Sequence, residues 1–151
     1  MLKFSLSCAA LLLAVASPVA ADAPPKADAD LAEQFLGCGY YFALLPSLSD
    51  KNLQGEQLAR VKELENFSRL AALALVGKEH AKLASAVARN GFSEELRQAD
   101  AKGDEAVLQF LRSWSDRCTT LMDQQASGVA PRIEAYVASD MEAREKGDAK
   151  P

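Results

Sequence analysis

The sequence predicts an all-α protein: an antiparallel bundle of four to five helices, stapled by one disulfide, that remains after a signal peptide is cleaved. Three observations indicate this. Apolar residues recur at helical spacing along most of the chain, without the alternation typical of strands. Cys38 and Cys118, 80 positions apart, each lie on such an apolar stripe. The first two dozen residues have the layout of a secretory leader.

Residues 1–21 are interpreted as a Sec-type signal peptide. Lys3 supplies a positive start, residues 4–16 form an apolar segment, and cleavage is expected after Ala21. This segment is shorter than the roughly 20 apolar residues that cross a membrane, and we expect no transmembrane segment in the mature chain. A periplasmic or secreted location follows. Cleavage also removes Cys8, so the two remaining cysteines are expected to pair in an oxidising compartment.

The mature chain is expected to form a single domain with flexible ends. Residues 22–29 are predicted to be a flexible lead-in, residues 30–141 the helical bundle domain, and residues 142–151 a disordered charged tail. The net charge of the whole chain is −4, and neither lysine nor arginine forms a block. This charge distribution argues against nucleic acid as a partner.

The first predicted helix carries Cys38. Asp30 is expected to cap its amino end, with Glu33 completing a capping box, and Pro46 is expected to stop it. Its apolar stripe consists of Leu31, Phe35, Cys38, Phe42 and Leu45. Gly37 and Gly39 beside the cysteine indicate close approach of another helix, or alternatively a backbone surface for a ligand; we favour packing.

The middle of the chain predicts two further helices. One runs from about Leu53 to Val76, where Gly77 kinks or ends it. Its segment Leu70–Val76 is apolar on all sides, which favours burial but also permits a homodimer interface. The next stretch begins at Lys78 and is expected to close at Asn90-Gly91, followed by a short helix after Ser93.

The fourth main helix carries the second cysteine. It is expected to begin at Asp104 and to end at Ser127-Gly128, and Pro131 suits the first turn of a final helix, Ile133 to about Met141. Its apolar stripe consists of Val107, Leu111, Trp114, Cys118 and Leu121. Two cysteines on core-facing stripes meet only if their helices are neighbours in space. We therefore predict a structural disulfide between Cys38 and Cys118.

Residues that would support catalysis or metal binding are scarce. His80 is the only histidine, and with lysines and a glutamate around it we interpret it as a solvated helix residue. One histidine and a bonded cysteine pair do not form the common zinc sites, so no metal and no cofactor are expected. The acidic pairs Glu63/Glu65, Glu94/Glu95 and Asp116/Asp123 lie among basic residues and are interpreted as solvated charges. No catalytic residue is predicted, and we expect that the protein is not an enzyme.

Tyr40 and Tyr41, beside Cys38 but off its stripe, are the predicted binding surface, since aromatic residues are enriched at contact sites. The first hypothesis is a non-catalytic module that binds another protein, of an inhibitor, immunity or envelope accessory type. In size, export and fold class the chain resembles small exported helical proteins with one disulfide, among them immunity proteins against bacterial toxins. The alternative is a small-molecule binder with a cavity between helices near Tyr40 and Trp114.

Overall fold

Helices form nearly all of the structure, a computed structural model that describes residues 23–48 and 53–148. They are α1 (Lys26–Leu48), α2 (Glu56–Asp100) and α3 (Asp104–Asp148). The predicted all-α class is confirmed. The predicted number of four to five helices is wrong, because these two ranges contain three. The expected signal peptide, residues 1–21, lies outside the described residues.

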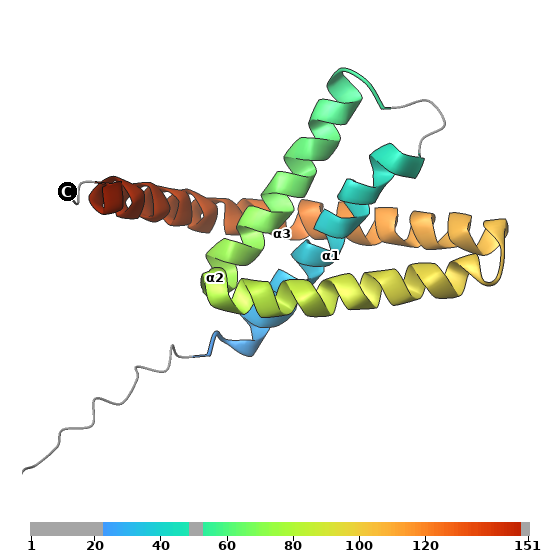
Figure 1. The fold of residues 1–151 in the computed structure, drawn as a ribbon, viewed down its shortest axis with the longest axis horizontal. Coiled ribbons are helices and arrows are strands. Elements are labelled where there is room, and N and C mark those ends of the chain that lie inside the picture. The colour runs from blue at the N-terminus through green and yellow to red at the C-terminus, as the bar shows by residue number, and fades with distance from the viewer. Residues whose placement is uncertain (1–22, 49–52, 149–151) are drawn as a thin grey trace, which may run out of the picture.

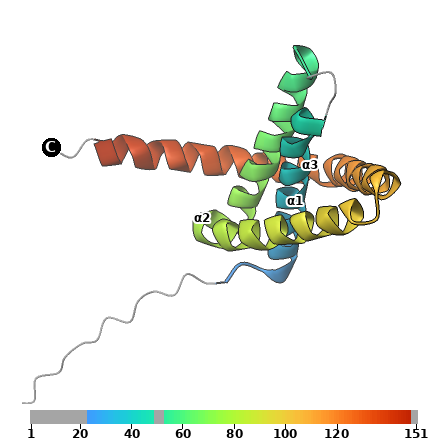
Figure 2. The same ribbon diagram turned by 45° about the vertical axis from the view of Figure 1, so that its right-hand side comes forward.

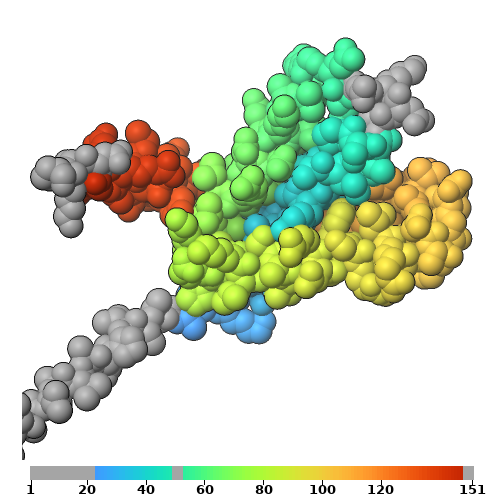
Figure 3. Space-filling view, in the orientation of Figure 1, coloured from blue at the N-terminus to red at the C-terminus, as the bar shows by residue number. Residues whose placement is uncertain are grey.

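The three helices form two helical hairpins that cross (Figures 1 and 2). In the first hairpin, α1 and the first half of α2 run side by side in opposite directions. In the second, the second half of α2 lies antiparallel to the first half of α3, after a tight turn in which Gly103 has a φ of 98°. The last part of α3 projects beyond the other helices as a single arm (Figure 3).

The central helix is α1, which packs against both halves of α2 and is bonded to α3. Of the stripe that the sequence predicts, Phe35, Cys38 and Phe42 are buried, while Leu31 and Leu45 at its ends are half-buried. Cys38 forms a disulfide with Cys118 of α3, with the two Cα atoms 5.5 Å apart. The predicted disulfide is therefore present, and both cysteines are at most 2% exposed.

The apolar segment of α2 before the bend is covered mainly by this chain itself. Ala71, Ala72, Leu75 and Val76 are buried, and Leu70, Leu73 and Ala74 are half-buried. Two of the four buried residues are alanines, whose small side chains let helices approach closely. These side chains therefore belong to the hydrophobic core, together with those of α1.

Gly77 interrupts the helical geometry of α2 and bends the helix. Its φ of 73° and ψ of 169° are accessible almost only to glycine, and helical geometry continues on both sides. Arg132 of α3 lies at this bend, where Nη2 donates to the carbonyl oxygen of Leu75 at 3.2 Å. That carbonyl belongs to the turn that ends at the bend, where intrahelical partners are lost. Arg132 also donates to both carboxylate oxygens of Asp28, at 3.0 and 2.8 Å, and so links all three helices.

Two predicted helix ends are not ends. The helix α2 continues through Asn90-Gly91, and α3 continues through Ser127-Gly128. A glycine within a helix costs only about 1 kcal/mol relative to alanine. Phe92 and Val129, directly after these glycines, are buried. Burial of a large apolar side chain contributes about 1.5–3 kcal/mol, which exceeds that local cost.

The helix α1 is longer than predicted at both ends. It begins at Lys26 instead of Asp30 and runs two residues past Pro46, which lies in its last turn. Residues 26–29 of the expected lead-in are thus helical. The ion pair of Asp28 with Arg132 gives this first turn a tertiary anchor that sequence periodicity does not reveal.

The helix α3 also extends past its predicted end. Pro131 lies inside it, and the helix reaches Asp148, so residues 142–148 of the expected tail are helical. Ion pairs one turn apart join Asp140 to Arg144 and Glu142 to Lys146. Such pairs each stabilise an exposed helix by about 0.2–0.5 kcal/mol.

Candidate functional site

Of the two tyrosines predicted to form a binding surface, only Tyr40 faces a hollow. Tyr41 is 7% exposed and packs against Phe42 in the core, with ring centroids 5.5 Å apart. Tyr40 is half-buried, and its hydroxyl oxygen lies 2.7 Å from Oγ of Ser85 and 3.2 Å from the Ser85 carbonyl oxygen. Since the carbonyl only accepts, the Tyr40 hydroxyl donates to it. This contact with α2 fixes the Tyr40 ring, which forms one wall of the hollow.

The hollow beside Tyr40, here called the Tyr40 groove, lies between the end of α1, the end of α2 and the start of α3. Its volume is about 670 Å³. It is lined by Tyr40, Ala43, Leu44, Ser47, Leu48, Phe92, Ser93, Leu96, Arg97, Asp100 and Val107. Figure 3 shows the surface falling away between the end of α1 and the second hairpin. The lining is mainly apolar, and Leu48 at its edge is 42% exposed.

Two helical stripes position the apolar side chains of this groove. Tyr40, Leu44 and Leu48 recur every four residues of α1, and Phe92 and Leu96 are one turn apart on α2. Residues four apart lie on one helical face, so each helix contributes one wall. The α1 stripe lies beside the stripe of Cys38, and its spacing is visible in the sequence. The α2 wall was missed because the sequence predicts a helix end at Asn90-Gly91.

At the polar rim of the groove, the guanidinium of Arg97 already forms an ion pair with Glu94. Arg97 donates to Glu94 at 2.9 and 2.7 Å, and the Gln98 amide donates to the same carboxylate at 2.8 Å. These hydrogen bonds, that of Arg97 foremost, lower the pKa of Glu94 to about 2. Glu94 therefore remains ionised at physiological pH. Asp100 is the acidic side chain that lines the groove itself.

An aromatic cluster fills the interior between Tyr40 and Trp114. The ring of Phe92 lies between them, with centroids 6.5 Å from Tyr40 and 5.0 Å from Trp114. Trp114 also packs against Phe110, and against Gly37, where a Cβ atom would come within 2.8 Å of its ring. The open space beside this cluster is the Tyr40 groove and another hollow, of about 520 Å³, that Gly37, Phe92 and Trp114 help to line.

Three of the six carboxylates singled out in the sequence, Glu63, Glu94 and Glu95, are engaged by other side chains. Glu95 accepts from the Trp114 indole at 3.1 Å and from Arg117 at 3.4 Å, and the Arg117 guanidinium lies 5.2 Å from the Trp114 ring centroid. Glu63 pairs with Arg60 at 3.3 Å. His80 is half-buried on α2 and does not line the groove. Within residues 23–48 and 53–148, no group of three or more His, Cys, Asp or Glu side chains is placed to hold a metal ion.

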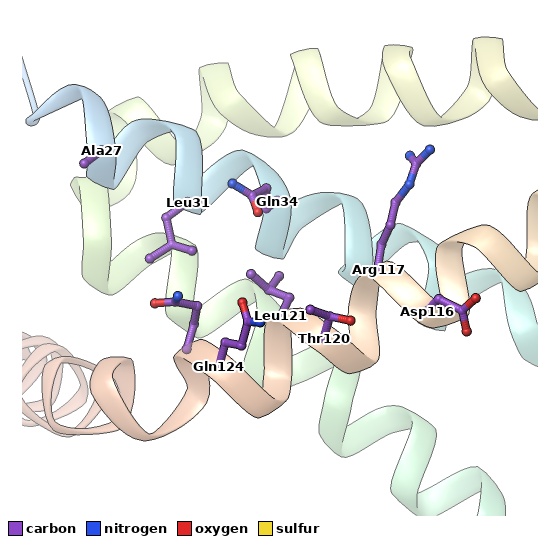
Figure 4. Close-up of a pocket in the computed structure, with 9 residues that line it drawn as sticks. Ala27, Leu31, Gln34, Asp116, Arg117, Thr120, Leu121 and Gln124 are labelled. Atoms are coloured by element: carbon purple, nitrogen blue, oxygen red, sulfur yellow. The ribbon is translucent and has the colours of Figure 1, made fainter.

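A second, more polar hollow of about 700 Å³ lies between the first half of α1 and the middle of α3 (Figure 4). Leu31 and Gln34 of α1 face Thr120, Leu121 and Gln124 of α3 across it. Its amide and hydroxyl groups form hydrogen bonds equally well with water, so this surface has no need of a ligand. The apolar Tyr40 groove is the stronger candidate for a binding site.

Comparisons with protein-family models, with curated proteins and with solved structures find no match to this chain. Among the described helices, none is both long and apolar enough to cross a membrane. The function of the protein is therefore inferred from the chemistry of its own surface. That surface combines a rigid, disulfide-bonded helical scaffold with one open apolar groove formed by three helices.

Proposed function

We propose that this protein is an exported, non-catalytic module that binds another protein through the Tyr40 groove. The observation that carries the proposal is the groove itself, where three helices meet and where Leu48 is 42% exposed and Leu44 and Leu96 are only half-buried. Exposed apolar surface of this kind is typical of interaction sites. The rigid aromatic wall of Tyr40 suits it to such a contact, since tyrosine is enriched where proteins bind each other.

The dimensions of the groove favour a short apolar segment of the partner. From Tyr40 to Leu48 the α1 wall is about 12 Å long, at 1.5 Å per helical residue. That length matches about two turns of a helix, which would place apolar side chains between the walls as in other helix-in-groove complexes. The partner is thus expected to present an amphipathic helix.

The location that we propose is the periplasm or the exterior of the cell. The leader pattern of residues 1–21 and cleavage after Ala21 support export. The buried disulfide supports it too, because such bonds persist in oxidising compartments. An inhibitor, an immunity factor or an envelope accessory protein would each fit this location.

Two other occupants of the groove are the alternatives. A volume of about 670 Å³ lies within the range of roughly 300–1,000 Å³ that is usual for small-molecule sites, so an apolar ligand would fit there. A second copy of this chain would give a homodimer. Native mass spectrometry of the purified mature protein distinguishes these from a separate protein partner, by a retained small mass or by a doubled mass.

The experiment that tests the proposal is affinity capture from an envelope extract with crosslinking, using the mature oxidised protein and two variants. Leu48→Glu places a charge at the edge of the groove, at a position 42% exposed, so the fold is expected to tolerate it. Leu83→Glu is the matched control, because Leu83 is 69% exposed and does not line the groove.

A partner that the wild type and Leu83→Glu retain and that Leu48→Glu loses supports the proposal. Equal capture by all three proteins, or loss only with Leu83→Glu, would exclude the Tyr40 groove as the interface. Failure of the wild type to capture any protein under crosslinking would contradict a protein-binding function.

A further inference from the structure

The bend of α2 forms a smaller hollow, distinct from the Tyr40 groove, in the angle between the two halves of the helix. Its volume is about 270 Å³. Three cationic side chains line it, Arg69 before the bend and Lys78 and Lys82 after it. Leu36 of α1, with Leu73 and Ala81 of α2, supplies an apolar floor. We call this hollow the basic elbow.

The charge of the basic elbow is opposite to that of the protein as a whole. The chain has a net charge of −4, yet no carboxylate is among the residues that line this hollow. Lys82 pairs with Glu79 at 2.9 Å, and the charge of Lys78 also helps to lower the pKa of that carboxyl group. Arg69 forms no ion pair with any residue that the structure describes, although Glu65 lines an adjoining hollow with it. One glutamate thus faces the two lysines, and an anion in the elbow would compensate the remaining positive charge.

The interruption of α2 adds to this positive potential. Helical geometry breaks at Gly77, and the second half of the helix starts at Lys78, on the wall of the elbow. The first amides of a helix lack intrahelical partners, and the positive end of the helix dipole lies there. Because Lys78 lies at this helix start, the dipole adds to the positive potential that the side chain of Lys78 produces.

The apolar floor and the volume of the elbow limit which molecule can carry the anionic group. Leu36 and Ala81 belong to the buried core, at 8% and 6% exposed, and they form the base of the hollow together with the half-buried Leu73. The volume of about 270 Å³ is just below the range of roughly 300–1,000 Å³ that holds drug-sized ligands. A ring or a short chain fills such a space, whereas a bare inorganic ion leaves the floor uncovered.

We propose that the basic elbow binds a small organic anion. Its carboxylate or phosphate lies between Arg69 and Lys78, and its apolar body rests on Leu36 and Leu73. Arg69 forms paired hydrogen bonds with such a group, and Lys78 acts as a point charge. This site is independent of the Tyr40 groove and of the partner proposed for it.

The test is a titration of the mature oxidised protein, followed by NMR of the methyl groups of Leu36, Leu73 and Ala81. The probes are phenyl phosphate, benzoate, inorganic phosphate and neutral benzyl alcohol, all at constant ionic strength. Each is added up to about 10 mM, so that binding with a millimolar dissociation constant is detected. Saturable shifts of these methyl signals are expected with phenyl phosphate or benzoate. Inorganic phosphate is expected to bind more weakly, and benzyl alcohol not to saturate.

Paired variants separate a specific site from diffuse attraction. The double variant Arg69→Gln/Lys78→Gln is expected to weaken binding by about tenfold or more, as loss of two charge-assisted contacts predicts. The double variant Arg60→Gln/Lys62→Gln removes the same charge from exposed positions of the same helix and is expected to leave the affinity unchanged. Dispersed methyl spectra establish that both variants are folded.

Three results would overturn the proposal: no saturable shift with either aromatic anion, equal affinity for inorganic phosphate, or equal weakening by both double variants. None of them bears on capture of a protein by the Tyr40 groove.

Discussion

At Gly37 the missing side chain lets Trp114 pack directly against the backbone of α1. A Cβ atom there would come within 2.8 Å of Cη2 and Cζ3 of Trp114. The ring has little freedom to move away, because Phe92 packs against it at 5.0 Å between centroids. At Gly39 the nearest atom to a Cβ would be Cβ of Ser68 at 3.5 Å, an ordinary contact. Gly37 is therefore a packing requirement, as the sequence favoured.

The two glycines consequently predict opposite results on substitution. Gly37→Ala is expected to lower the free energy of unfolding by about 1–3 kcal/mol, the usual cost of overpacking. Gly39→Ala adds helix propensity worth up to about 1 kcal/mol and is expected to be neutral or stabilising. Urea unfolding followed by circular dichroism measures both. Equal destabilisation by the two substitutions would contradict this account.

Asp28 and Arg132 join the beginning of α1 to α3, beside the bend of α2. The hydrogen bonds from Arg132 lower the pKa of Asp28 below its ordinary value of 3.8. A carboxyl group whose pKa is lowered by folding stabilises the folded state when it is ionised. This contribution is complete above the ordinary pKa and is lost as the pH falls through the lowered folded value.

Asp28→Asn should therefore be destabilising at pH 7, and its difference from the wild type should shrink as the pH falls below about 4. Unfolding free energies of both proteins between pH 7 and pH 2.5 test this. Asp30→Asn is the control, since Asp30 is 55% exposed in a surface pair with Lys26 and such pairs contribute about 0–1 kcal/mol. A difference for Asp28→Asn that stays constant with pH would show that the ion pair is not its cause.

At the scale of the element, the bend of α2 determines where both hollows form. The first half of α2 runs along α1, and the second half turns to meet α3 (Figure 1). The walls of the basic elbow come from both sides of Gly77, and those of the Tyr40 groove include the end of the redirected half.

Gly77→Ala is expected to lower the free energy of unfolding by about 1–3 kcal/mol, because its φ of 73° and ψ of 169° strain any residue with a Cβ atom. The same change at Gly91 offers a control within the same helix, since Gly91 is helical and a Cβ there meets nothing within 4 Å. Gly91→Ala is expected to stabilise by up to about 1 kcal/mol. Chemical unfolding of both variants provides the comparison, and a neutral Gly77→Ala would mean that the bend tolerates a side chain.

At the scale of the whole molecule, one covalent bond holds the two crossed hairpins together. The disulfide joins residues 80 positions apart, between the central helix and the last one. In the chain-entropy model, closing a loop of this length stabilises the folded state by about 4–5 kcal/mol. That amount is comparable to the total stability of a marginal domain, about 5 kcal/mol.

The variant Cys38→Ala/Cys118→Ala is therefore expected to melt far below the oxidised wild type, or to be unfolded at 37 °C. Thermal unfolding of the variant, of the oxidised protein and of protein reduced in denaturant and then refolded gives the comparison. Thiol counting by mass spectrometry establishes the redox state of each sample. Equal melting temperatures would exclude a structural role for the bond.

The lining of the Tyr40 groove could be predicted from the sequence only in part. Tyr40 was identified by its place beside Cys38, and it lines the groove. Tyr41, one position away and 100° further around the helix, is in the core. Phe92 and Leu96 were missed as groove residues because local signals predict a helix end before them. The contact of Arg132 with Asp28, 104 positions away, leaves no local signal at all.

The sequence by itself determined the helical class, the core face of each cysteine-bearing helix and the pairing of Cys38 with Cys118. These depend on periodicity along the chain and on the chemistry of two buried thiols. Only the tertiary structure decided that α2 and α3 continue through Gly91 and Gly128, and where the two hollows form. The physical reason is that a glycine inside a helix costs only about 1 kcal/mol. Burial of an apolar side chain against residues distant in the sequence contributes more than this, so the helix continues.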